Sequence, residues 1–272
     1  MKWAFANPDK VYISCIFSDN LPHTRGIPKY YPDSDVKIGG PALGYPNALP
    51  EEMEHIMPDY SLYPDMDYSM GFTTRGCIRS CPFCIVPQIE GSFRHYENPE
   101  LFCNPDFDKV ILLDNNLLAS RFLMEDLKWI KDQGLKVCFN QGLDARLVTE
   151  DIANQLVEMK AYNLHFNHRT YYFSWDLIDE ENGVLRGLER MIEAGLRSYS
   201  LMVYILVGFN TTHKQDVYRF KKLSELGADP FVMIYNNRKD DPWIRHFARY
   251  VNKRVYKISS LEDYKPYDLS RA

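Results

Sequence analysis

The sequence predicts an α/β fold built on a parallel sheet, and three observations lead to that prediction. Short apolar, β-prone runs alternate with longer segments of helical periodicity through most of the chain. Gly134, Gly195 and Gly227 each lie directly after a predicted helix, where a left-handed residue commonly ends it. The predicted strands are mostly continuous apolar runs rather than alternating ones, as expected where both faces of a sheet are covered.

From residue 67 onward this alternation repeats five or six times, which predicts parallel strands joined by helical crossovers. The predicted strands cover residues 68–73, 110–113, 137–140, 170–175, 200–207 and 230–235. The predicted helices cover residues 121–133, 149–160, 180–194 and 213–226. Thr149 is expected to cap the second of these helices, because Glu150 and Asp151 follow it in the first turn.

Residues 1–66 differ in composition from the rest of the chain. They hold nine of the 16 prolines, and their five basic and nine acidic residues give −4 of the total charge of −5. Prolines this frequent prevent long regular elements. We therefore expect an irregular N-terminal extension with one or two strands, a turn at residues 38–41 and a short helix near residues 50–57.

Size and composition exclude several classes of protein. The 272 residues, 45% hydrophobic and 25% charged, fit a folded α/β domain with an extension. The net charge of −5 excludes a generally polybasic nucleic-acid binder. No apolar run approaches the roughly 18–20 residues of a membrane span, and the first residues lack a signal-peptide core. We expect a cytoplasmic protein without a membrane partner, whose six cysteines are thiols or metal ligands.

Cys77, Cys81 and Cys84 form a C-x3-C-x2-C run just after the first predicted strand. Three thiolates this close on one loop can bind one metal centre. A structural zinc or closed iron–sulfur site usually has four ligands, so three ligands indicate a coordination position left open. The alternatives are a zinc loop completed by His95 and three unrelated thiols. Zinc sites generally come as two ligand pairs, and the other three cysteines form no second pair.

The segment of residues 74–84 resembles the radical S-adenosylmethionine (radical SAM) superfamily. The cysteine spacing and Phe83 before the third cysteine match the family motif. The resemblance implies a partial parallel (β/α)6 TIM-like barrel over residues 67–236, after the extension of residues 1–66 and before a basic helix and tail over residues 237–272. It also implies a 4Fe–4S cluster held by the three cysteines, with S-adenosylmethionine bound through its amino and carboxylate groups to the fourth iron.

This resemblance implies an enzyme that reductively cleaves S-adenosylmethionine to methionine and a 5′-deoxyadenosyl radical, which abstracts hydrogen from a substrate. It also implies an electron donor such as flavodoxin or ferredoxin. The alternatives are an activase that generates a radical on a partner protein, an RNA-modifying enzyme, and a non-catalytic iron–sulfur or zinc binding module. The acidic net charge favours a small-molecule or peptide-like substrate over RNA.

Polar residues follow the predicted strands, where functional groups gather in barrels of this kind. By the resemblance, Asn115 falls where the second strand contacts the methionine amine, although the family's Gly-Gly-Glu is missing here. Arg146 is a candidate partner for the methionine carboxylate and Asp176 for the ribose hydroxyls. Loop salt bridges and helix caps are the alternative roles for these side chains. Gln141 is a further candidate, and Gly208 would let the backbone approach adenine.

Residues 1–66 resemble the end of the cobalamin-binding domain that precedes the barrel in many radical SAM enzymes. Too little chain is present for that domain, and residues 19–26 read Asp-x-x-x-His-x-x-Gly where the family motif is Asp-x-His-x-x-Gly. We therefore expect no bound cobalamin and a loop position for His23.

At the other end of the chain, residues 238–257 hold seven basic and two acidic residues. Arg245 and Arg249 share one face of a predicted helix that begins near Trp243. This face could bind phosphate on a nucleotide or RNA substrate, and a solvated helix face is the alternative.

Overall fold

Two parallel sheets form the centre of the protein, which the computed structural model describes over residues 8–44, 54–237 and 241–265. The first sheet has the order β3 (Ser69–Gly71), β6 (Lys109–Leu112), β7 (Lys136–Phe139) and β8 (Lys160–Ala161). The second has the order β9 (Tyr171–Ser174), β10 (Leu201–Val207) and β11 (Asp229–Ile234). A bridge between Leu143 and Phe173 connects the two sheets. These parallel strands confirm the predicted α/β fold.

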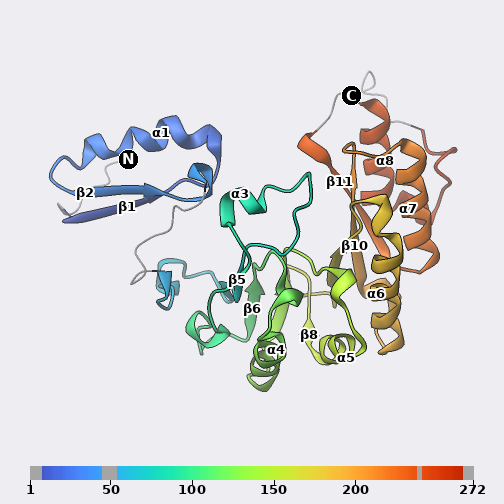
Figure 1. Ribbon diagram of the computed structural model, residues 1–272, viewed down its shortest axis with the longest axis horizontal. Helices are drawn as coiled ribbons and strands as arrows, with labels where there is room; N and C mark the ends of the chain where they lie inside the picture. Colours follow the sequence, from blue (N-terminus) through green and yellow to red (C-terminus); the bar gives the residue numbers. More distant parts are fainter. Residues whose placement is uncertain (1–7, 45–53, 238–240, 266–272) are drawn as a thin grey trace.

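The longer helices lie on the outer side of the sheets (Figure 1). They are α4 (Leu123–Asp132), α5 (Glu150–Glu158), α6 (Glu181–Glu193), α7 (His213–Glu225) and α8 (Pro242–Asn252). Val137 and Phe173 point to this side and belong to the main buried cluster. Cys138 and Tyr172 point to the other side and belong to a smaller inner cluster. Both faces of the strands are therefore covered, which explains their continuous apolar sequence.

Each strand and helix predicted after residue 67 is present, with its ends within two residues of the predicted ones, whereas the two-residue strand β8 was not predicted. The Thr149 side chain accepts a hydrogen bond from the Ile152 amide at 3.2 Å, which confirms the expected cap of α5. Gly134, Gly195 and Gly227 have φ angles of 69°, 102° and 80°, so each ends its helix as predicted. None of the described helices is both long enough and apolar enough to cross a membrane.

Residues 8–44 form a small unit to one side of the two sheets (Figure 1). In it β1 (Lys10–Ser14) pairs in parallel with β2 (Asp35–Gly39), which confirms the expected strands. Gly40 has a φ of 101°, and a Cβ there would be 2.6 Å from the Cys15 carbonyl oxygen. The turn after β2 therefore packs directly on the end of β1, and only glycine fits there.

His23 lies in the short helix α1 (Leu21–Arg25) and not in a loop, so that expectation was wrong. Pro22 in the first turn favours a helix start, and five residues carry too little periodicity to reveal a helix in the sequence. Most of the helix predicted near residues 50–57 lies outside the described residues.

Three short elements near the cysteines were not predicted. They are β4 (Thr74–Arg75), α3 (Val86–Glu90) and β5 (Arg94–His95). β4 and β5 pair in antiparallel fashion, so the chain leaves β4, forms the cysteine loop and α3, and returns beside its starting point. Two- and five-residue elements carry no periodic signal in a sequence.

Candidate functional site

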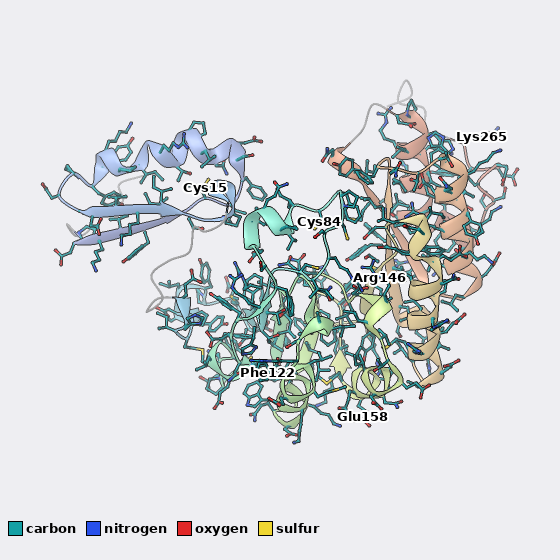
Figure 2. All side chains as sticks on the ribbon, viewed as in Figure 1. Cys15, Cys84, Phe122, Arg146, Glu158 and Lys265 are labelled. Carbon is teal, nitrogen blue, oxygen red and sulfur yellow. The ribbon has the colours of Figure 1, made fainter. Side chains whose placement is uncertain are left out.

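Cys77, Cys81 and Cys84 lie in the loop between β4 and α3, beyond the carboxyl end of β3. All three are free thiols of intermediate exposure, and Figure 2 labels Cys84 in this loop. Gly76 begins the loop with a φ of 75°, and a Cβ there would be 2.7 Å from the Ser92 carbonyl oxygen. The Cys84 amide donates to the Cys81 carbonyl at 3.0 Å. The loop is thus closed at its base and turned on itself between the second and third cysteines.

Asp114, just after β6, holds the start of this loop. Its Oδ1 accepts from the amide and hydroxyl of Thr73 at 3.0 and 2.8 Å, and from those of Thr74 at 2.5 and 2.7 Å. Its Oδ2 is buried without a hydrogen-bond partner among the described residues. Burial raises the pKa of Asp114 above its ordinary value, although the four hydrogen bonds oppose this effect. Four hydrogen bonds therefore tie the end of β6 to the base of the cysteine loop.

Asn116 and Arg79 connect Cys77 to Asp144, which lies in the segment after β7. The Asn116 Nδ2 lies 3.4 Å from both the Cys77 Sγ and the Asp144 Oδ2. The Arg79 amide donates to the Cys77 Sγ at 3.3 Å, and its Nε pairs with the Asp144 Oδ2 at 3.0 Å. The Asn116 Oδ1 is buried with no hydrogen-bond partner in the described parts of the chain. Two donors and one unused acceptor therefore lie beside the first cysteine.

Asp144 also organises the 3-10 turn Ala145–Leu147, which carries Arg146. Its carboxylate accepts from the Arg146 amide at 3.2 Å and from the Nε and Nη2 of that side chain at 2.6 and 3.0 Å. The Arg146 Nη1 pairs with Glu180, which follows β9. Burial would raise the pKa of Asp144, but the charges and hydrogen bonds of Arg146 and Arg79 hold it below its ordinary value.

Cys81 lies within electrostatic reach of these ion pairs. Burial raises the pKa of its thiol, the charge of Glu180 raises it further, and Arg146 opposes both. Cys84 and Cys77 add smaller effects that also raise it, so the three thiols are electrostatic neighbours. Added positive charge beside Cys81, such as that of a metal centre, would oppose this rise and favour the thiolate.

The donor set fits a centre with three cysteine ligands. Cys103 and Cys138 are buried in the two core clusters and Cys15 is buried in the N-terminal unit, so the loop supplies three thiols. No group of three or more His, Cys, Asp or Glu side chains in the described ranges is arranged to hold a single metal ion. A cubane cluster is larger than an ion and its sulfur ligands lie farther apart, so that finding concerns single-ion sites.

Two of the predicted site residues lie at the ends of their strands without a described role. Asn115 is half-buried after β6, and Gln141 is exposed in the turn after β7. His95, the alternative zinc ligand, lies against the Phe122 ring at a centroid distance of 4.6 Å. Gly208, after β10, has a φ of 79°, and a Cβ there would be 2.9 Å from the Ile244 Cδ1.

Arg146 and Asp176 are the predicted residues that the structure brings together. Burial raises the pKa of Glu180, and the charges of Asp176 and Asp144 act in the same direction, while Arg146 opposes them. Asp176 is half-buried, and burial raises the pKa of its carboxyl group as well. The carboxyl ends of β7 and β9 therefore share one charged cluster beside Cys81. Figure 2 shows Arg146 in this region and Glu158 at the opposite end of α5.

Two residues of the site, Arg79 and Glu180, were missed in the sequence, and two more, Asn116 and Asp144, were placed after their strands without a role. Arg79 lies inside the cysteine motif, and Asp144 lies two positions before Arg146. Opposite charge was the one signal that could have suggested a pair between them.

A comparison with models of known protein families gives no match for this chain, and a comparison with curated proteins gives none.

Proposed function

We propose that the protein is a radical SAM enzyme in which Cys77, Cys81 and Cys84 hold a 4Fe–4S cluster. The observation that carries this proposal is the convergence of three free thiols with polar side chains from the ends of β6, β7 and β9. When bound, the cluster would pass an electron to S-adenosylmethionine and so generate the radical that abstracts hydrogen from a substrate. A reduced flavodoxin or ferredoxin would supply that electron.

We further infer that the two sheets form a partial (β/α)6 barrel with the strand order β3-β6-β7-β9-β10-β11. The Leu143–Phe173 bridge and the hydrogen bond from the Leu143 amide to the Tyr172 carbonyl, at 2.7 Å, support this order. The inner cluster of Ile111, Cys138 and Tyr172 also supports it, because its members and the side chains packed against it come from both sheets. Barrels of this type bind their ligands at the carboxyl ends of the strands, where the cysteine loop lies.

In this proposal Arg146 binds the methionine carboxylate. Asp144 holds its Nε and Nη2, which leaves Nη1 to exchange Glu180 for a ligand carboxylate. Such an exchange keeps the guanidinium in place while the ligand enters. Asp176 would accept from the ribose hydroxyls, and Asn115 would contact the methionine amine.

The remaining assignments of this proposal rest on position alone. Gln141 follows β7 and would line the ligand beside Arg146, and Gly208 follows β10 and would face adenine. The substrate class that we propose is a small molecule or a peptide-like chain, and no cobalamin is part of the proposal.

The test is anaerobic reconstitution of the full chain with iron and sulfide, followed by reduction with dithionite. We expect 5′-deoxyadenosine release from wild type, and a changed electron paramagnetic resonance spectrum of the reduced cluster when S-adenosylmethionine is added. Cys81→Ala should abolish both. Cys138→Ala is the matched control, because Cys138 is fully buried in the inner cluster and away from the loop.

The spectroscopic readout matters because turnover in this family can require the substrate. A cluster whose spectrum does not respond to S-adenosylmethionine, or a cluster with four protein ligands, would contradict the proposal and favour an electron-transfer module. Zinc in place of iron after reconstitution would favour a structural metal site.

A further inference from the structure

A cleft of about 1010 Å³ opens at the amino ends of β9, β10 and β11. Thr170, Ser200 and Ala228 line it, and each directly precedes one of these strands. The cysteine loop lies beyond the opposite, carboxyl ends of the strands, so the length of a strand, roughly 20 Å for β10, separates the two. The cleft is therefore distinct from the proposed cluster site, and the inference below does not rest on the proposed function.

The lining of this cleft is positively charged, although the chain has a net charge of −5. Arg169, Arg197, Arg254 and Lys257 line it, and Asp229 is the carboxylate among its lining residues. The Asp229 carboxylate already forms an ion pair with Arg254, whose Nε donates to its two oxygens at 3.1 and 3.0 Å. Arg169, Arg197 and Lys257 form no ion pair with a carboxylate in the described parts of the chain. Lys257 still lies within electrostatic reach of Asp229, and Arg169 donates to the carbonyl of Val157. Four cations against one carboxylate nevertheless leave the lining with an excess of positive charge.

An exposed aromatic ring lies among these cations. Tyr199 lines the cleft and is 64% exposed, so its ring is accessible to a ligand in the cleft. The Arg197 Nη1 donates to its hydroxyl at 2.8 Å, so the ring and the guanidinium are held side by side. A flat ring next to a fixed cation is the combination that binds a base and its phosphate together.

We propose that this cleft binds a nucleotide unit, either as a free nucleotide or within single-stranded RNA. Its phosphate would lie between Arg169, Arg197 and Lys257, and its base would stack on Tyr199. The volume suits a ligand of this size, because ligand pockets commonly measure about 300–1,000 Å³. The planar fork of arginine suits phosphate oxygens, and two of the three cations without a carboxylate ion pair are arginines.

The basic segment of residues 238–257 contributes only part of this surface. Arg254 and Lys257 line the cleft, whereas Arg245 and Arg249 lie on the exposed side of α8 outside the lining. The remaining cations come from the segments that precede β9 and β10. The fold, rather than a run of basic residues, therefore creates the charge of the cleft.

The experiment measures binding of three probes to the full chain by fluorescence anisotropy and competition. The probes are a labelled single-stranded RNA oligonucleotide, adenosine monophosphate and inorganic phosphate. We expect the RNA to bind with an affinity that falls as salt rises. Arg169→Gln/Arg197→Gln should weaken binding about tenfold or more, and Tyr199→Leu about fivefold or more. Arg186→Gln, an exposed arginine on α6, is the matched control and should change affinity less than about twofold.

The competition arms distinguish the two sources of the ligand. Displacement of RNA by adenosine monophosphate indicates a free nucleotide, and binding of RNA alone indicates a nucleic-acid chain. The inference is overturned if no probe binds, or if the double variant binds the probes as tightly as wild type does. It is also overturned if phosphate competes as effectively as the nucleotide while Tyr199→Leu leaves the affinity unchanged. Should the double variant fail to fold, Lys257→Gln provides the same test with one exposed side chain.

Discussion

Gly187 lies directly against the backbone of Ala145, because a Cβ carbon at position 187 would be 1.9 Å from the Ala145 carbonyl oxygen. Helix α6 can pack this closely on the turn Ala145–Leu147 only through a residue without a side chain. The turn carries Arg146, and Asp144 caps it. The close packing of α6 on the turn Ala145–Leu147 therefore determines where the charged cluster around Arg146 lies.

Gly187→Ala should lower the free energy of unfolding by about 1–3 kcal/mol, because the added methyl group displaces the turn. The gain in helix propensity, about 1 kcal/mol, offsets only part of this loss. Gly183→Ala is the control, because its Cβ would be 3.0 Å from the Cγ of the Arg146 side chain, which can move. Urea unfolding of both variants tests the prediction, and equal stability of the two would contradict it.

Arg219→Leu should destabilise the protein by about 3–5 kcal/mol, since it leaves buried groups without partners. Arg219 is 0% exposed. Its guanidinium donates to the carbonyls of Trp175, Asp176 and Leu206 at 2.6, 2.8 and 2.7 Å. It also pairs with Asp216 at 2.7 Å. This one side chain therefore holds the carboxyl ends of β9 and β10.

Asp216→Asn in the Arg219→Leu background should recover part of that loss, because it removes the unpaired buried charge. Unfolding of both single variants and the double variant forms a double-mutant cycle. A double variant whose loss equals the sum of the single losses would show that the two side chains do not act as a pair.

Asp126 should make stability depend on pH. This α4 residue is 4% exposed, and burial, reinforced by the charge of Asp114, raises the pKa of its carboxyl group to about 7. In the unfolded chain the same group ionises near pH 4, at about its ordinary value. The folded protein thus holds a proton that the unfolded chain has lost. The stability from this group is complete below about pH 4 and is lost as the pH rises to about 7.

Asp126→Asn should therefore be more stable than wild type at about pH 8, by an amount of the order of 2 kcal/mol, and about equally stable near pH 4. Asp132→Asn, an exposed α4 carboxylate paired with Lys128, is the control and should show little of this trend. Urea unfolding at both pH values measures the difference. An equal gain in the free energy of unfolding at the two pH values would mean that the carboxyl group of Asp126 is not protonated in the folded state.

The proposed function predicts that Arg146→Gln weakens S-adenosylmethionine binding about tenfold or more and leaves the iron content unchanged. Arg146→Lys should recover only part of the affinity, because an ammonium group lacks the bidentate fork. Equilibrium binding to the reconstituted protein, with iron analysis, measures both quantities. Arg79→Gln is the control, since it removes the other cation on Asp144. Loss of iron in Arg146→Gln would give this side chain a structural role in place of a binding one.

The regular elements could be predicted from the sequence because periodicity, caps and glycine stops act locally. Helix α7 begins at the predicted residue, His213, and β10 ends at the predicted residue, Val207. The pair between Arg146 and Glu180 could not be predicted this way. The two residues are 34 positions apart, and ion pairs between loops leave no pattern along the chain. The same reason applies to the cleft, whose cations come from three separate segments.

The Leu143–Phe173 bridge has a mechanical consequence for the site. The seam between the two sheets passes through the segment that holds Arg146, whereas Glu180 belongs to the segment beyond β9. The Arg146–Glu180 ion pair therefore joins the two sides of this seam. A shift of one sheet relative to the other would therefore change the geometry of this ion pair, whose two members set the electrostatic surroundings of Cys81.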